Sequence, residues 1–204
     1  MASKKKVAIY GGTFSPPHVG HVNVAKAVEG EIKPDKLLII PTFISPHKSQ
    51  CSDASPEQRL EMCRLAFSDI GCAQVSDMEI VREGKSYTYD TICELYQDDV
   101  ELILVCGTDM ILSFDRWYRF QDILKMVSLA YVRRENDDEI SRQIDSKVEE
   151  YRQKYNASVK ELKVAAVEIS SSEIREKIKN GSDVSSYLPA NVKGYVEKWK
   201  IYCK

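Results

Sequence analysis

Short apolar runs of strand length alternate with helix-period segments along this chain of 204 residues. The runs that predict buried strands are Val7–Tyr10, Leu37–Ile40, Leu102–Cys106, Leu129–Val132 and Val164–Ile169. Continuous apolar runs of this kind are typical of a parallel sheet that is covered on both faces. The alternation of strands and helices therefore predicts an α/β fold with a doubly wound parallel sheet and right-handed crossovers.

Local end signals place helices between these strands. The segment Ser55-Pro56-Glu57-Gln58 combines an N-cap, a proline at the first helical position and a residue able to close a capping box. Apolar residues then follow at helical spacing, at Leu60, Cys63, Phe67 and Ile70. A further helix is expected over Tyr89–Tyr96, and Gly181 is placed to end a helix that begins near Ser172.

Residues 135–160 are densely charged but carry one apolar stripe. The stripe consists of Ile140, Ile144, Val148, Tyr151 and Tyr155. This spacing predicts an amphipathic helix on the surface. The chain shows no internal repeat and no interdomain linker, so we expect one domain over residues 1–204 with this helix at its periphery.

The composition excludes several classes of function. The formal net charge of −2 argues against a general binder of nucleic acid or anionic membranes, so any phosphate binding must be local. No apolar run approaches the roughly 20 residues needed to cross a bilayer. The N-terminus lacks a signal-peptide pattern, and the six cysteines include no C-x-x-C pair. A cytoplasmic location is expected.

The first candidate for chemistry follows directly after the first strand. The segment from Gly11 to His21 reads Gly-Gly-Thr-Phe-Ser-Pro-Pro-His-Val-Gly-His. Two glycines would let the backbone turn tightly and approach a ligand. A helix that starts near His18 would direct its free amides and positive dipole end at the same place, which makes an anion site. His18 and His21 would share one face of its first turn and could donate to phosphate oxygens.

Other interpretations of this segment are weaker or less specific. It is neither a Walker loop nor a G-x-G-x-x-G dinucleotide motif. No cysteine or acidic residue lies at zinc-ligand spacing near the two histidines. Taken alone, the histidines are better explained as surface residues after a glycine turn.

A second candidate is the segment 169–175, Ile-Ser-Ser-Ser-Glu-Ile-Arg, after the last predicted strand. Ser170 or Ser171 could cap a helix, and Glu173 would complete a capping box with Ser170. Arg175 would project from the first turn, where a phosphate is favoured by both the free amides and the guanidinium. By itself the segment is better explained by a capped helix with a solvated arginine.

Together the two segments resemble the nicotinate-nucleotide adenylyltransferases of the H-x-G-H nucleotidylyltransferase superfamily. Residues 11–21 are similar to the signature Gly-Gly-Thr-Phe-x-Pro-Pro-His-x-Gly-His, with Ser15 where the family usually has Asp. Residues 169–175 are similar to Ile-Ser-Ser-Thr-x-Ile-Arg, with Ser172 in place of Thr. The resemblance implies a Rossmann-like nucleotidyltransferase fold. The implied ATP-binding residues are Gly11, Gly12, Thr13, Phe14, His18, His21, Gly107, Asp109, Ser170, Ser172 and Arg175, with His18, His21 and Arg175 catalytic.

Shorter similarities lie between the two motifs and imply the acceptor site. Pro46-His47-Lys48 resembles Pro-Pro-His-Lys/Arg, and Ser86-Tyr87-Thr88 resembles Ser-Tyr-Thr, whose backbone amides would bind the nicotinate carboxylate. Phe114 to Tyr118 resembles Phe-x-x-Trp-Tyr, whose tryptophan would stack on the pyridine ring. Arg133-Arg134 resembles the start of Arg-Arg-Pro-Gly, but Glu135-Asn136 replaces the last two residues. The implied substrate-binding residues are His47, Lys48, Tyr87, Thr88, Trp117 and Arg134.

The resemblance implies adenylyl transfer from ATP to nicotinate mononucleotide, giving the acid dinucleotide precursor of NAD and pyrophosphate. The acceptor phosphate would attack the α-phosphorus in line, with no covalent enzyme intermediate, so catalysis would come from positioning and charge neutralisation. Mg²⁺ would arrive on the ATP phosphates, because no dedicated carboxylate cage is visible. The expected partners are the two small substrates, and the sequence leaves open whether the chain forms a homo-oligomer.

Two other functions stay open at this point. The same fold could serve another acceptor, such as nicotinamide mononucleotide, phosphopantetheine or a cytidylyl acceptor. The segments at Tyr87 and Trp117 favour a pyridine nucleotide. A nucleotide-binding regulatory protein that has lost turnover is a rival of another class, and the presence of His18, His21 and Arg175 argues against it.

Overall fold

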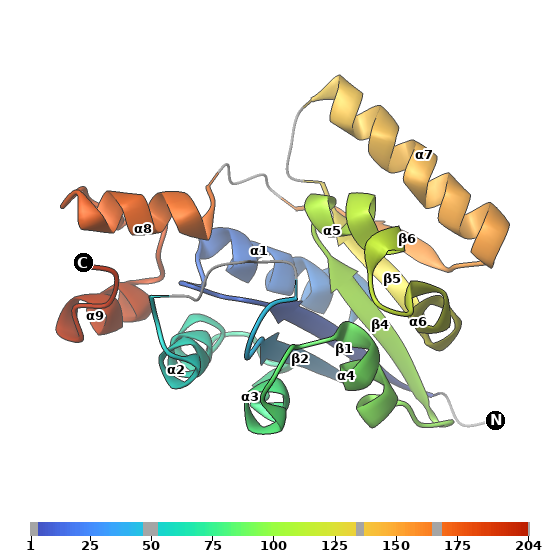
Figure 1. The fold of residues 1–204 in the computed structure, drawn as a ribbon, viewed down its shortest axis with the longest axis horizontal. Coiled ribbons are helices and arrows are strands. Elements are labelled where there is room, and N and C mark those ends of the chain that lie inside the picture. Colours follow the sequence, from blue (N-terminus) through green and yellow to red (C-terminus); the bar gives the residue numbers. More distant parts are fainter. Residues whose placement is uncertain (1–3, 47–52, 134–136, 165–168, 204) are drawn as a thin grey trace.

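The computed structural model describes residues 4–46, 53–133, 137–164 and 169–203. Within these residues, six strands form one sheet in which every pairing is parallel (Figure 1). The strands are β1 (Lys5–Gly12), β2 (Lys36–Pro41), β3 (Ala73–Val75), β4 (Val100–Cys106), β5 (Val127–Val132) and β6 (Val159–Leu162). The predicted α/β fold with a parallel sheet is confirmed.

The order of the strands creates a switch point near the middle of the sheet. The order is β3-β2-β1-β4-β5-β6, so the chain winds outward from β1 through β2 to β3 and then returns to β4. From β4 it winds outward in the opposite direction. The loops after β1 and β4 therefore diverge at the carboxyl edge of the sheet, which is where ligands bind in open α/β folds.

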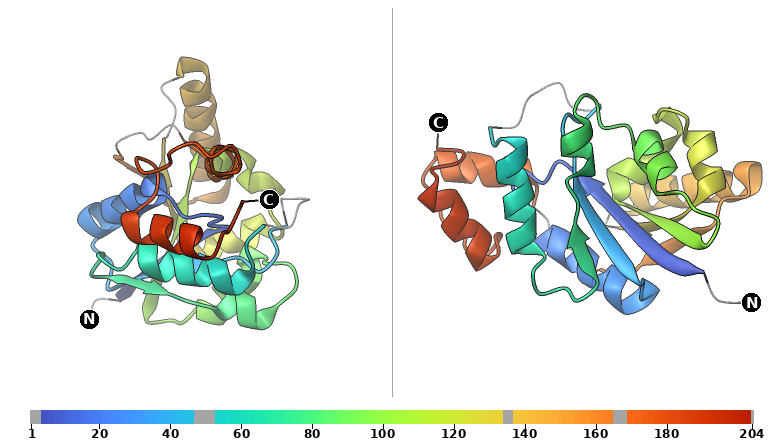
Figure 2. Two further views of the ribbon diagram at one scale, coloured as in Figure 1. Left: turned by 90° about the vertical axis from the view of Figure 1, so that its left-hand side faces the viewer. Right: turned by 90° about the horizontal axis from the view of Figure 1, so that it is seen from below.

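Helices cover both faces of this sheet (Figures 1 and 2). Alternate residues of β1 point to opposite faces, so Ala8 and Tyr10 join one apolar cluster and Ile9 joins the other. Helices α1 (Val19–Ala27), α2 (Pro56–Ala66), α8 (Ser171–Lys179) and α9 (Ala190–Lys198) contribute to the first cluster. The second cluster is covered by α4 (Thr88–Leu95), α5 (Thr108–Ser113), α6 (Phe120–Met126) and α7 (Asp138–Tyr155). This is the doubly wound arrangement.

Three shorter segments connect these elements. The π-helical turn η1 (Val28–Ile32) extends α1 toward β2, and α3 (Met78–Arg82) follows β3. The 3-10 turn η2 (Phe114–Arg116) extends α5. At the far end of the chain α9 lies beside α2, where the side chain of Asn191 donates to the carbonyl of Leu65 at 2.7 Å (Figure 2).

Two helix-end predictions are confirmed by their hydrogen bonds. The Gln58 N–H donates to Ser55 Oγ at 3.2 Å, and the Ser55 N–H donates to Gln58 Oε1 at 2.9 Å, which completes the capping box of α2. After α8, Gly181 has φ +68, a left-handed conformation that glycine adopts without strain. The N–H groups of Gly181 and Ser182 return to the last turn of α8, as in a Schellman motif.

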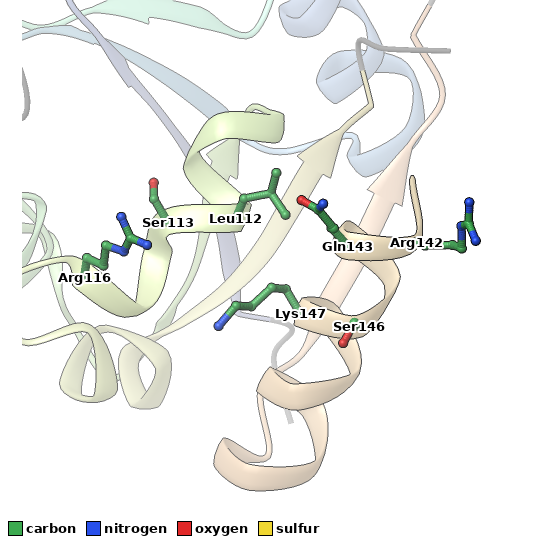
Figure 3. Close-up of a pocket in the computed structure, with 7 residues that line it drawn as sticks. All are labelled: Leu112, Ser113, Arg116, Arg142, Gln143, Ser146 and Lys147. Carbon is green, nitrogen blue, oxygen red and sulfur yellow. The ribbon is translucent and has the colours of Figure 1, made fainter. Parts of the chain in front are cut away.

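The amphipathic stripe at 135–160 forms α7, and its centre is buried at Ile144, Val148 and Tyr151. The Tyr151 hydroxyl donates to the Ile111 carbonyl at 3.0 Å, and Lys147 Nζ lies 2.7 Å from a carboxylate oxygen of Asp115. Beside these contacts, a hollow of about 560 Å³ is lined by residues of α5, η2 and α7 (Figure 3). None of the predicted site residues that the structure describes lines this hollow.

Helix α7 has 18 residues, and most of the side chains outside its apolar stripe are charged or polar. Within the residues that the structure describes, no helix is both long enough and apolar enough to cross a membrane.

Most of the strand predicted over Val164–Ile169 lies outside the described residues, and neither of its end residues is in a strand. Among the described strands, the sheet ends at this edge with β6, whose central residues Lys160 and Glu161 are exposed. Such an edge strand, polar at its centre, has no continuous apolar run. The three-residue strand β3 was missed because it is too short to show a pattern.

Candidate active site

The loop after β1 carries the first predicted motif, but its glycines do not make the turn. Gly11 and Gly12 continue β1 and pair with Ile40 and Pro41 of β2. The left-handed residue is Phe14, with φ 48. A Cβ atom on Gly12 would lie 3.1 Å from the Phe14 ring. The expectation of a glycine turn is therefore corrected: Gly12 is needed because an aromatic ring packs directly against its backbone.

Phe14 connects the loop to the core and to the histidine pair. Its side chain is buried, and its ring lies 5.5 Å from Tyr10, 5.8 Å from Phe67 and 5.0 Å from His21, measured between centroids. The edge-to-face geometry of these contacts is the favoured one for aromatic pairs. Phe14 thus fixes the loop from the inside, and its side chain is a packing element beneath the predicted ATP site.

The two histidines lie together at the start of α1, as the sequence predicted. His18 is the N-cap residue and is only 2% exposed, and its ring centroid lies 3.8 Å from that of His21. The backbone N–H of His18 donates to His21 Nδ1 at 3.1 Å. Because Nδ1 is the acceptor, the proton of a neutral His21 ring is on Nε2. His21 can therefore present an Nε2–H donor in a fixed tautomer.

The second motif forms the start of α8. The Glu173 N–H donates to Ser170 Oγ at 3.2 Å, and the Ser170 N–H donates to Glu173 Oε2 at 2.7 Å, so the predicted capping box is confirmed. The hydroxyl and the N–H of Ser170 both donate to the Glu173 carboxylate, and these two hydrogen bonds lower the pKa of that carboxyl. The capping box fixes the direction of the first helical turn, from which Arg175 projects.

The structure brings the two motifs into direct contact. Arg175 Nη1 donates to the carbonyl of Ser15 at 2.9 Å, and Ser171 Oγ donates to the carbonyl of Pro16 at 2.9 Å. Arg175 Nη2 also donates to Ser172 Oγ at 3.1 Å. The loop that leads into α1 and the first turn of α8 therefore form one wall, although about 160 residues separate Ser15 from Arg175.

A tyrosine near the end of the chain supports the same loop and was not predicted. The hydroxyl groups of Tyr202 and Ser15 lie 3.0 Å apart, and both side chains are buried. Burial raises the pKa of the Tyr202 hydroxyl. Ser15 stands where the family usually has Asp, and its hydroxyl forms this contact. Only the fold could reveal the pair, because 187 positions separate its members.

We expect Tyr202→Phe to lower the free energy of unfolding by about 1 kcal/mol, because one buried hydrogen bond is lost while the ring remains. Chemical denaturation of the parent and the variant measures the difference. Ser15→Ala and the double variant complete a double-mutant cycle, in which the two losses should not add. Strictly additive losses would show that the two hydroxyls do not interact.

The loop after β4 lies beside the loop after β1, as the strand order requires. Gly107 is the N-cap of α5, and Asp109 is exposed in its first turn. The Thr108 hydroxyl donates to the Val132 carbonyl at 3.3 Å and so links the start of α5 to the end of β5. Asp109 is therefore presented at the carboxyl edge of the sheet, where the sequence predicted a nucleotide contact.

The predicted acceptor segment at 86–88 opens α4 and is bonded to the loop after β2. Tyr87 is the N-cap of α4, so the free amides of this helix begin at the predicted Tyr87–Thr88 pair. The Phe43 N–H donates to Ser86 Oγ, and the Ser86 N–H donates to the Ile44 carbonyl, both at 2.9 Å. The segment at 86–88 is thereby held against the loop after β2.

Trp117 and Tyr118 follow η2, and the Tyr118 ring contacts aromatic residues at the start of α4. The Tyr118 ring is 55% exposed, and its centroid lies 5.0 Å from that of Tyr87. Trp117 is only 8% exposed and packs on Phe114, with 5.0 Å between centroids. The predicted stacking of Trp117 on a pyridine ring stays a prediction. Tyr118 belongs to the same motif and presents the more accessible ring.

Three predicted site residues, His47, Lys48 and Arg134, lie outside the described residues. Within the described ranges, no three histidine, cysteine or acidic residues gather as a metal site would require. The described site therefore consists of the His18–His21 pair, the Arg175 wall, the start of α5 and the start of α4.

Comparison with known proteins identifies the family. A model of the Cytidylyltransferase-like family matches residues 9–177. A probable nicotinate-nucleotide adenylyltransferase of Hydrogenobaculum is 37% identical over 97% of this chain and 98% of its own length. One from Listeria monocytogenes is 32% identical over 98% of this chain and 99% of its own. The chain belongs to the nicotinate-nucleotide adenylyltransferase family.

Solved structures agree with this family's fold. Nicotinic acid mononucleotide adenylyltransferase of Plasmodium falciparum, in complex with NaAD, matches 97% of each chain with a TM-score of 0.73 at 18% identity. A putative nicotinate-nucleotide adenylyltransferase from Vibrio parahaemolyticus covers 98% of this chain and 96% of its own, with a TM-score of 0.66 and 22% identity. The predicted Rossmann-like nucleotidyltransferase fold and the predicted family are thus both confirmed.

Proposed function

We propose that this protein transfers the adenylyl group of ATP to nicotinate mononucleotide, forming nicotinate adenine dinucleotide and pyrophosphate for NAD synthesis. The observation that carries the proposal is the pair of hydrogen bonds from Arg175 and Ser171 to the carbonyls of Ser15 and Pro16. They hold two helix starts at one place, each with free amides and a positive dipole end. Full-length relatives that bear this enzyme name support the substrate assignment.

The ATP phosphates would lie between the starts of α1 and α8. His18, His21 and Arg175 would donate to the α-phosphate and to the departing pyrophosphate. Ser170, Ser172 and the backbone of residues 11–14 would hold the remainder of the nucleotide, with Gly107 and Asp109 at the ribose. Negative charge grows on these oxygens as pyrophosphate leaves, so donors fixed in advance lower the barrier most.

The acceptor would lie between the start of α4 and the loop after β2. The amides at Tyr87 and Thr88 would bind the nicotinate carboxylate, since a helix start favours an anion. Trp117 would lie against the pyridine ring, and His47, Lys48 and Arg134 would approach the acceptor phosphate. That phosphate, with a second pKa of ~6, is largely ionised at neutral pH and attacks without a strong general base.

ATP would enter as its Mg²⁺ complex, so the ion is part of the substrate. Mg²⁺ usually keeps several waters and binds through substrate phosphates with few protein ligands. The protein would contribute the positions of the phosphates and the donors around them, as in other phosphoryl-transfer enzymes.

A pyrophosphate-release assay tests the proposal. Purified protein is incubated with MgATP and either nicotinate mononucleotide, nicotinamide mononucleotide or phosphopantetheine, and with ATP alone as control. We expect release with the nicotinate compound, and slower release with the amide because the start of α4 favours a carboxylate. Release with phosphopantetheine alone would reassign the acceptor. A chain that binds ATP but releases no pyrophosphate with any acceptor would be a regulatory protein instead.

A further inference from the structure

A buried arginine lies beneath the two substrate loops, outside the family motifs described above. Arg59 is in the first turn of α2 and is only 2% exposed, and it is among the largest fully buried side chains of the described protein. The apolar residues of this helix begin at Leu60, so the sequence pattern would leave Arg59 at the surface. Arginine is almost never fully buried unless its donors are satisfied, so its environment requires an explanation.

The guanidinium group makes two hydrogen bonds, each to a different loop. Nη1 donates to the Thr13 carbonyl at 3.0 Å, and Nη2 donates to the Phe43 carbonyl at 3.1 Å. Within the described ranges, no carboxylate lies within 4 Å of Arg59. Burial lowers the pKa of the Arg59 guanidinium, but an arginine stays protonated in proteins. The Arg59 guanidinium therefore forms no ion pair with a carboxylate of the described chain.

The two carbonyls belong to the ATP side and the acceptor side of the proposed site. Thr13 lies in the loop that leads to His18, and Phe43 lies in the loop after β2. Phe43 is in turn bonded through its N–H to Ser86, next to the predicted nicotinate-binding amides. A continuous chain of hydrogen bonds thus runs from Thr13 through Arg59 and Phe43 to the start of α4. Arg59 is the side chain that joins its two halves.

We propose that Arg59 is a positioning residue that sets the distance between the loop holding ATP and the loops holding the acceptor. The inference rests on the proposed function, because the distance matters only if both substrates bind there. In-line attack requires reacting atoms about 3–3.5 Å apart, and a displacement of about 1 Å can slow such a step about 100-fold. The planar guanidinium fixes two acceptors at once, which an ammonium group on a flexible stem does not.

The test compares Arg59→Lys, which keeps the charge, and Arg59→Ala with the parent protein. The matched control is Arg64→Ala, on the same helix, where the side chain is 55% exposed and forms an ion pair with Glu61. For each protein we would measure kcat, both KM values, the dissociation constant of a non-hydrolysable ATP analogue and the circular dichroism spectrum. The Ala variant would also be assayed with about 20 mM guanidinium chloride, well below denaturing concentrations, and with equal urea as the neutral control.

We expect Arg59→Lys to lower kcat about 30-fold while the affinity for the ATP analogue changes less than about threefold, because the charge remains but the two-pronged geometry is lost. Guanidinium, but not urea, should raise kcat of Arg59→Ala at least about fivefold, since the ion can occupy the vacated space and bridge the two carbonyls. Arg64→Ala should match the parent. A residue that only stabilises the core would not produce this separation of kcat from binding.

The outcomes distinguish this inference from the proposed function. If the parent releases no pyrophosphate with any acceptor, the proposed function fails. If the parent is active and Arg59→Lys keeps kcat within about twofold, only the positioning role fails. Loss of ATP-analogue affinity equal to the loss of kcat, or failure of both variants to fold, would make Arg59 a structural residue and would also overturn the inference.

Discussion

Replacing His18 with Ala is expected to lower kcat about 10³-fold, which is the size of effect seen when a fixed donor to a developing negative charge is removed. The affinity for a non-hydrolysable ATP analogue should fall less than about threefold, because the proposed donor acts mainly on charge that appears in the transition state. His18 is suited to this because its ring is buried and held against His21, with 3.8 Å between centroids.

The matched variant for this experiment is His18→Gln, whose amide N–H can replace a ring donor but cannot pack as a ring. It should recover part of the lost turnover. Rapid-quench single-turnover measurements would separate the chemical step from product release. Unchanged kcat in His18→Ala would remove the proposed role of this residue in phosphate stabilisation.

Replacing Arg175 with Ala is expected to lower kcat/KM for ATP by about 10²–10³-fold. Two effects contribute: a guanidinium is lost from the proposed phosphate site, and the loop at Ser15 loses its hydrogen bond to α8. Arg175→Lys keeps the charge without the second donor to Ser172 and should lie between the parent and the Ala variant. Steady-state kinetics with ATP varied at saturating acceptor measures the series.

The control for this series is Lys179→Ala. Lys179 is at the other end of α8, where it pairs at 3.7 Å with Asp53 and is far from the helix start. Its kinetics should equal those of the parent at the same ionic strength. Equal losses in Arg175→Ala and Lys179→Ala would indicate that α8 as a whole has been destabilised and that Arg175 has no specific role.

Long-range contacts explain why Arg59 and Tyr202 were not picked out from the sequence. Arg59 follows a correctly predicted capping box, yet a pattern of apolar and polar positions assigns any arginine to the surface. Tyr202 lies in no motif recognised in the sequence, and only the folded chain places its hydroxyl against Ser15. The partners of Arg59 lie 16 and 46 positions away, and the partner of Tyr202 lies 187 positions away. Local spacing therefore carries no information about these contacts.

Element predictions succeeded where one segment carries its own physical signal. The apolar run of β1, the capping box of α2 and the stripe of α7 each need only neighbouring residues to be recognised, and all three are confirmed. The edge strands β3 and β6 were not predicted, because neither carries such a signal in its own residues. Edge strands form mainly because a neighbouring strand offers unpaired backbone groups, which depends on the sheet already being present.

The amino-acid order alone determined the parallel α/β architecture, the two anion-favouring helix starts and, through the length of its two motifs, the family. Periodicity, capping and ordered motifs are local properties of a chain, so they survive without coordinates. Tertiary structure decided that Phe14 makes the turn that Gly11 and Gly12 were expected to make, that Arg175 reaches the Ser15 carbonyl, and that Arg59 joins the loops after β1 and β2. Those facts depend on which surfaces meet when the sheet closes its core, and that is a property of the whole fold.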